Sequence, residues 1–94
     1  MDQQKTNIKP EFEEELGISL ACRVVLYNDD WHTFDEVINQ IIKATKCPFE
    51  QARTLTFEVH VKGKAIVHSG DIKECLEVSS VLQEIGLHTQ IVTD

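Results

Sequence analysis

Residues 24–38 read VVLYNDDWHTFDEVI, and within them the chain passes from a strand pattern through a polar loop to a helix pattern. The mainly apolar run Cys22–Tyr27 predicts a short β-strand. Thr33, followed three residues later by Glu36, predicts a capping box at the start of a helix. Residues 28–32 therefore form a loop between two regular elements, and this loop carries an amide and two carboxylates.

The helix that follows Thr33 has a strongly amphipathic sequence. Its apolar residues recur with the period of an α-helix, at Phe34, Val37, Ile38, Ile41 and Ile42. We expect this helix to end near Lys46. Pro48 then suits the first turn of a second element, residues 49–63.

The pattern of residues 49–63 fits two kinds of element. Leu55, Phe57, Val59 and Val61 alternate with polar residues, which is typical of a strand. A helix would instead bring together Phe49, Ala52, Leu55, Thr56 and Val59 on one face. Periodicity alone leaves both readings open.

The rest of the chain predicts a strand, a helix and a strand. The first strand covers Lys64 to His68 and the last covers Thr89 to Val92. Asp71 and Glu74 form a capping-box-like start for the helix between them, which Gly86 closes. The apolar face of this helix consists of Ile72, Cys75, Val78, Leu82 and Ile85.

Length and charge limit the functions open to this chain. Ninety-four residues suggest one small domain, with little room for a deep enzyme cleft. The net charge of −7 disfavours nucleic acid as a partner and suits cationic ligands. We expect a flexible acidic arm over residues 1–20 and a folded domain over residues 21–94. Three scattered cysteines, no membrane-spanning run and no signal peptide indicate a cytoplasmic protein.

Asn28, Asp30 and His60 have the chemistry to hold a small cation such as a free peptide α-amino group. The α-amine has a pKa of about 8, so it is mostly an ammonium with three N–H donors at neutral pH. An amide oxygen, a carboxylate and a neutral imidazole would supply three acceptors. The alternative is structural: Asn and Asp are common turn residues, and His60 taken alone is an ordinary surface histidine.

The segments Val24–Trp31 and His60–Ala65, together with the helix from Phe34, resemble the ClpS family of adaptors, which hand N-degron substrates to Clp proteases. The resemblance runs without a gap from Val24 to Ala65. It implies a helix for residues 49–63, and hence an α+β fold of order βααβαβ. Such a fold has a three-stranded antiparallel sheet with its helices packed on one face.

The ClpS resemblance also implies a site and partners. It assigns the α-amino group to Asn28, Asp29, Asp30 and His60, with Asp29 in a supporting role. By the same resemblance, the residues expected to form the hydrophobic pocket for the first side chain are Phe34, Val37, Thr56 and Val59. The expected substrates begin with Phe, Tyr, Trp or Leu, and the expected partner is a Clp-type AAA+ unfoldase, ClpA-like or ClpC-like. No cofactor, metal or catalysis is expected, and in such adaptors the arm takes part in delivery.

The chain departs from the family pattern in two places. The family usually has Thr-Pro-Met where this chain has His32-Thr33-Phe34, and its methionine excludes β-branched first residues. Phe34 is stiffer and larger than methionine. Thr56 stands where the family usually has a larger apolar residue. We hypothesise that Thr56 offsets Phe34 by leaving room in the pocket.

Other functional classes have weaker support. The sequence lacks a recognisable nucleophile motif, so we expect no enzyme activity. A zinc site from His32, His60, His68 and Asp30 is possible in composition, but these residues show no close-spaced ligand pattern. The main alternative is a non-enzymatic interaction domain, because the order βααβαβ also resembles the C-terminal domain of the ribosomal stalk protein. Such a domain would bind a partner through a helix face.

Overall fold

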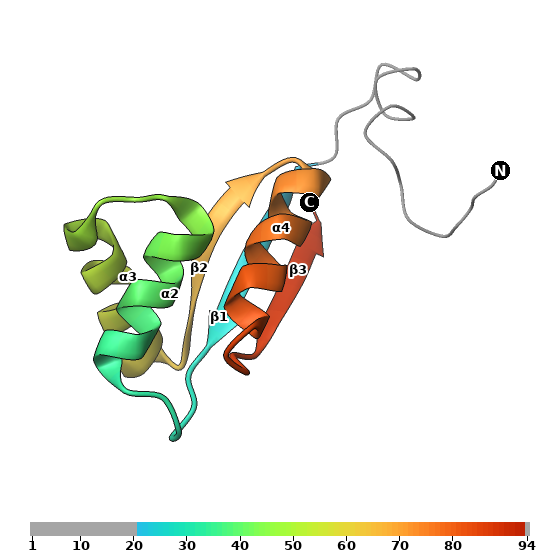
Figure 1. The fold of residues 1–94 in the computed structure, drawn as a ribbon. Coiled ribbons are helices and arrows are strands. Elements are labelled where there is room, and N and C mark those ends of the chain that lie inside the picture. The colour runs from blue at the N-terminus through green and yellow to red at the C-terminus, as the bar shows by residue number, and fades with distance from the viewer. Residues whose placement is uncertain (1–20, 94) are drawn as a thin grey trace, which may run out of the picture.

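Six regular elements follow one another along residues 21–93, the part of the chain that the computed structural model describes (Figure 1). Their bounds are β1 Cys22–Tyr27, α2 Phe34–Thr45, α3 Phe49–Lys62, β2 Lys64–Gly70, α4 Ile72–Gln83 and β3 Thr89–Thr93. The predicted α+β class and the order βααβαβ are confirmed. The expected arm, residues 1–20, lies outside the described residues.

The three strands form one antiparallel sheet with β1 in the centre, in the order β2-β1-β3. Leu26 of β1 is paired with Ala65 on one side and with Thr89 on the other. The register of β1 against β2 shifts between Val24 and Val25, where β2 carries Val67 as one extra residue. Such a bulge increases the local twist of the sheet.

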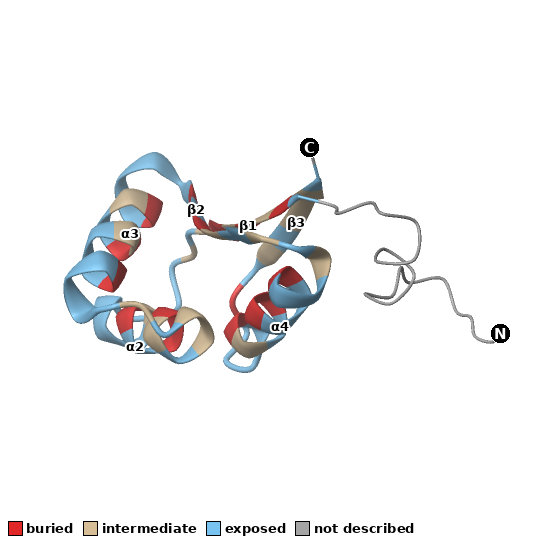
Figure 2. Cartoon of the chain, turned by 90° about the horizontal axis from the view of Figure 1, so that it is seen from above, coloured by how far each residue is buried: buried red, intermediate tan, exposed pale blue. Residues whose placement is uncertain are grey.

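One face of the sheet is covered by the helices and the other is open (Figure 2). On the central strand, Cys22, Val24 and Leu26 are buried under the helices, whereas Arg23 and Val25 are only half-buried on the opposite face. This alternation follows from the period of two of a β-strand. The predicted packing of the helices on one face is therefore confirmed.

Helix α2 begins with the predicted capping box. The Thr33 hydroxyl accepts from the Glu36 backbone N–H at 3.1 Å, and the Glu36 carboxylate accepts from the Thr33 backbone N–H at 2.8 Å. Its buried face carries Ile38 and Ile41. Buried Gln40 donates to the Val81 carbonyl at 2.7 Å, which fixes α2 against the end of α4.

The segment with two possible readings is a helix, α3. Ala52, Thr56 and Val59 lie on its buried face, at the spacing of a helix. It ends at Gly63, whose φ of +89° is accessible to glycine with little cost. The backbone N–H of Gly63 donates to the Val59 carbonyl at 2.8 Å and closes the last turn.

Helix α4 packs across the sheet through Cys75, Val78 and Leu82, and its start is capped by Asp71. It ends at Gln83, three residues before the expected stop at Gly86, which instead shapes the following turn with a φ of +85°. Burial and the neighbouring Cys22 raise the pKa of the Cys75 thiol to about 11. No helix within residues 21–93 is long and apolar enough to cross a membrane.

The Leu26 side chain is fully buried in the core, so its truncation to alanine leaves a cavity. We expect Leu26→Ala to lower the free energy of unfolding by about 2–5 kcal/mol, measured by urea denaturation. Leu76→Ala is the matched control, because Leu76 is exposed on α4, and its effect should stay within about 0.5 kcal/mol. Equal losses in the two variants would contradict the placement of Leu26 in the core.

Candidate functional site

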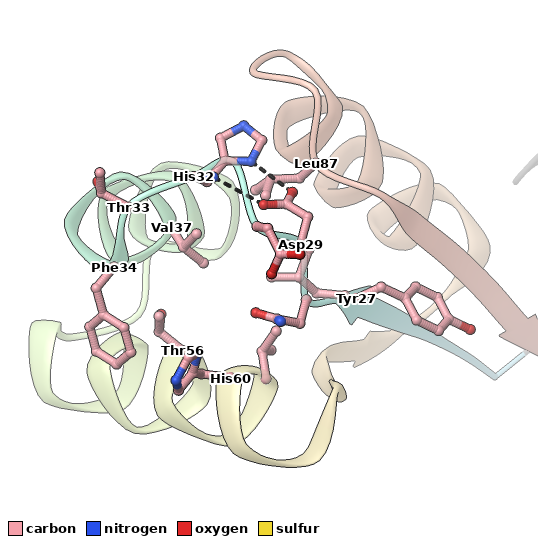
Figure 3. A pocket seen from close by; sticks show the side chains of 13 residues that line it. Tyr27, Asp29, His32, Thr33, Phe34, Val37, Thr56, His60 and Leu87 are labelled. Atoms are coloured by element: carbon pink, nitrogen blue, oxygen red, sulfur yellow. Dashed lines mark hydrogen bonds and ion pairs between the residues drawn. The ribbon is translucent and has the colours of Figure 1, made fainter.

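A cavity of about 280 Å³ opens where the β1–α2 loop (residues 28–33), α2, α3 and the α4–β3 turn (residues 84–88) meet (Figure 3). All eight residues predicted for the site line this one cavity. They are Asn28, Asp29, Asp30, Phe34, Val37, Thr56, Val59 and His60. The polar members come mainly from the loop, and the apolar members come from the two helices.

The apolar wall on the α2 side is set by the helix cap. Because the capping box at Thr33 fixes where α2 begins, it also fixes Phe34 as the first helical residue and Val37 one turn later. Phe34 stays partly exposed at the mouth. Its ring packs edge-on against the His60 ring, with the centroids 6.3 Å apart.

The opposite wall comes from α3, where Thr56, Val59 and His60 project toward the cavity from successive turns. Val59 and Thr56 are buried, so the floor of the cavity is also part of the core. The Thr56 hydroxyl donates to the Ala52 carbonyl at 2.8 Å. A polar residue can therefore line this apolar wall without an unpaired donor.

The rim of the cavity carries hydrogen-bond acceptors that receive no hydrogen bond from another residue within residues 21–93. Within residues 21–93, the side chains of Asn28, Asp30 and His60 make no hydrogen bond to another residue. The Asn28 backbone is nevertheless fixed, because its N–H donates to the Gly63 carbonyl at the end of α3 at 2.9 Å. This arrangement can accept the three N–H groups of an ammonium ion.

Asp29 has a different environment from Asp30. Its Oδ1 accepts the backbone N–H groups of Trp31 and His32 at 2.9 and 3.0 Å, and its Oδ2 lies 2.8 Å from His32 Nδ1. Burial opposes ionisation of this carboxyl, but the three hydrogen bonds outweigh burial and lower its pKa. Its oxygens are thus engaged inside the loop.

His32 was not among the residues predicted for the peptide site, yet it lines the cavity and joins two of its walls. Its Nε2 donates to the Ile85 carbonyl in the α4–β3 turn at 2.5 Å, while Nδ1 faces Asp29. The hydrogen bond to Ile85 and the one to Asp29 raise the pKa of this imidazole.

Sequence reasoning missed four further lining residues, namely Leu26, Tyr27, Thr33 and Leu87. Thr33 was assigned only as a cap, and Leu26 and Tyr27 only as strand residues. The Tyr27 ring points away from the cavity (Figure 3), and its hydroxyl donates to Gln90 at 2.6 Å. Leu87 follows Gly86 in a turn far along the chain, and no local sequence pattern indicates that this leucine is buried beside the cavity.

The open sheet face has a second hollow, of about 450 Å³. Arg23 and Lys64 line it beside the apolar Val25, Ile66 and Val92. Glu58 also lines it, so two cationic side chains and one anionic side chain surround this hollow, which makes it a poorer site for an ammonium ion than the acidic rim of the first cavity.

The residues considered for zinc are not arranged as ligands. Within residues 21–93, no group of three or more His, Cys, Asp or Glu side chains is placed to hold a metal ion. His68 lies at the far end of β2, where its Nε2 is 3.2 Å from Glu74.

Sequence and structure comparisons find similar proteins. Residues 19–90 match the model of the family described as ATP-dependent Clp protease adaptor protein ClpS. The chain is 34% identical over 64 residues to the ClpS adapter of Oleidesulfovibrio alaskensis, covering 66% of this chain and 62% of that protein. It is also 34% identical over 70 residues to the E3 ubiquitin-protein ligase UBR1 of Drosophila melanogaster, covering 73% of this chain but only 4% of the ligase.

A solved structure shares the fold. Agrobacterium tumefaciens ClpS2 bound to L-phenylalaninamide superposes with a TM-score of 0.70 at 18% sequence identity. The likeness covers 81% of this chain and 99% of that chain.

The hydrogen bonds of Thr33 cap the N-terminus of α2, and α2 forms one wall of the cavity. We expect Thr33→Ala to lower the free energy of unfolding by about 0.5–2 kcal/mol, because the Glu36 backbone N–H loses its acceptor. Thr54→Ala, at an exposed position within α3, serves as the control and should leave stability unchanged or slightly higher. Thermal unfolding followed by circular dichroism compares the two, and an unchanged Thr33→Ala protein would contradict the cap's contribution.

Proposed function

The chain belongs to the ClpS family, and from that premise we propose that it is an adaptor for N-degron substrates. In this proposal the cavity binds the free α-amino group and the large hydrophobic first side chain of a substrate protein. The adaptor then delivers the substrate to a Clp AAA+ unfoldase. The observation that carries the proposal is the convergence of all eight predicted residues on one cavity.

The rim would capture the amine. Asn28 Oδ1, the Asp30 carboxylate and neutral His60 would each accept one N–H of the ammonium, while Asp29 holds the loop that presents the first two. Charge-assisted hydrogen bonds of this kind contribute about 1.5–3 kcal/mol each at best. An acetylated N-terminus has neither the charge nor the three donors, so it should be excluded.

The interior of the cavity would take the first side chain. Val37, Val59 and Leu87 supply apolar surface, and burying a large apolar side chain there contributes roughly 1.5–3 kcal/mol. Together with amine capture, and after the cost of association, we expect a net binding free energy of about −8 kcal/mol, which corresponds to a micromolar Kd.

Phe34 and Thr56 would set the preference among first residues. Phe34 stands at the mouth, where its ring is braced against His60. Thr56 is small, and its hydroxyl is turned back to the Ala52 carbonyl, so the wall beneath Phe34 leaves space for a ligand. We propose that the two residues compensate, so that Phe, Tyr, Trp and Leu are all accepted.

The adaptor would perform no chemistry itself. Its partner would be a ClpA-like or ClpC-like unfoldase, and residues 1–20 would act in delivery as an N-terminal arm. We assign this activity to the cytoplasm, because Cys22, Cys47 and Cys75 form no disulfide bond within residues 21–93, as is usual in a reducing compartment. Residues 21–94 would form the adaptor domain.

The first test is fluorescence anisotropy with a labelled peptide that begins with Phe, beside its N-acetylated twin. We expect a micromolar Kd for the free peptide and at least about tenfold weaker binding of the acetylated peptide. Asn28→Ala and His60→Ala should each weaken binding by about tenfold or more, because each removes one acceptor from the ammonium.

Matched controls for this test are Asn39→Ala and His68→Ala, which change the same residue types outside the cavity. Both should bind the free peptide as the unmodified protein does. Equal binding of the free and acetylated peptides would refute amine capture. No binding of peptides that begin with Phe, Tyr, Trp or Leu would favour an interaction domain that uses a helix face.

The compensation between Phe34 and Thr56 can be measured with a double-mutant cycle. Thr56→Met alone should overfill the cavity and weaken binding of Phe and Trp peptides by about tenfold. The double variant Phe34→Met with Thr56→Met should recover most of that loss, because a flexible side chain at the mouth makes room for the larger wall. Strictly additive effects would show that the two positions act independently.

A further inference from the structure

We propose that His32, as a doubly protonated imidazolium, is a positioning residue that ties the β1–α2 loop to the α4–β3 turn and so shapes the binding cavity. The loop carries Asn28 and Asp30, and the turn carries Leu87. The inference rests on the proposed function, because the geometry that His32 maintains is that of the peptide site.

Both ring nitrogens of His32 face groups that can only accept. Nδ1 lies 2.8 Å from a carboxylate oxygen of Asp29, and Nε2 lies 2.5 Å from the Ile85 carbonyl oxygen. A neutral imidazole carries a single N–H, so it can satisfy one of these oxygens while its lone pair faces the other. Only the imidazolium donates to both.

The charges around the ring favour the same state. Asp29 on the loop and Glu36 on α2 both act on His32 with negative charge. From the α4–β3 turn, the group that faces the ring is the Ile85 carbonyl, while the neighbouring Glu84 is paired with Lys43 at 2.9 Å. The His32 side chain is 13% exposed and that of Asp29 is 17% exposed, so the bond between them is partly buried, whereas the bond to Ile85 lies at the surface.

The two hydrogen bonds of His32, to Asp29 and to Ile85, form a clamp, and the position of His32 in the loop explains how this clamp shapes the cavity. The near end of the loop is already held, because the Asn28 N–H donates to Gly63. Within residues 21–93, the His32–Ile85 hydrogen bond is the one that ties residues 29–32 to an element outside the loop. Without it, the Asp30 carboxylate and the Leu87 wall would lose their fixed separation.

The two histidines of the cavity therefore need opposite protonation states. His60 must be neutral to accept from the ammonium, whereas His32 must be charged to donate twice. The folded state raises the pKa of His32. The clamp is therefore fully formed at pH values below the ordinary pKa of histidine, and it is lost as the pH rises through the raised pKa. The pKa of Asp29 is lowered, so its carboxylate is ionised throughout this range.

The direct test is NMR of the histidine ring nitrogens in the unliganded protein. We expect His32 to show two protonated nitrogens at neutral pH and to lose one proton with a midpoint above the ordinary range. In Asp29→Asn, the Asn amide group can donate to Nδ1, so His32 should convert to the neutral form with its proton on Nε2. A neutral His32 in the unmodified protein at neutral pH would overturn the proposal.

The functional test compares the Kd of the Phe peptide for the unmodified protein and His32→Gln between pH 6 and 9. Glutamine can donate to only one of the two acceptors at a time, so we expect about five- to tenfold weaker binding near pH 6. The ratio of the two Kd values should approach one as His32 loses its proton. Deprotonation of the peptide amine affects both proteins equally and cancels in this ratio.

The outcomes separate this inference from the proposed function. His68→Gln is the matched control and should bind as the unmodified protein does. A Kd ratio of one at every pH would overturn the positioning role while leaving the adaptor function intact. No binding of the Phe peptide by the unmodified protein would overturn the adaptor function and the positioning role together, even with a charged His32 in the NMR spectrum.

Discussion

Two backbone hydrogen bonds at the end of β1 hold together the parts of the chain that form the cavity. The Tyr27 N–H donates to the His88 carbonyl at 3.0 Å, and the Asn28 N–H donates to the Gly63 carbonyl at 2.9 Å. The first joins β1 to the turn before β3, and the second joins it to the end of α3. Because β1 is paired on both edges, its end is a rigid point from which the loop departs.

Much of this arrangement could be predicted from sequence, and the limits have physical causes. The period of α2 and the cap at Thr33 are local signals, so both were read correctly. Residues 49–63 were ambiguous because Phe57 and Val61, which produce the strand-like alternation, are 59% and 60% exposed on α3. Leu87 and the His32–Ile85 bond depend on tertiary packing between segments distant in sequence, which no local pattern reports.

Three consecutive residues that depart from the family pattern have separate tasks around one cavity. His32 bonds to the α4–β3 turn, Thr33 caps α2, and Phe34 stands at the mouth. The neighbouring carboxylates also differ, since that of Asp29 is engaged within the loop and that of Asp30 makes no hydrogen bond within residues 21–93. These five residues lie within one run of six, residues 29–34, and they differ in role because their side chains contact different partners.

The bulge in β2 has a consequence for how copies of this protein behave at high concentration. Strands β2 and β3 are the edges of the sheet, and such edges present backbone groups that another chain can pair with. The extra residue Val67 twists β2, Lys64 places a charge at its start, and β3 has only five residues. A neighbouring copy would find no long, flat strand to extend, which protects the small sheet against growth into aggregates.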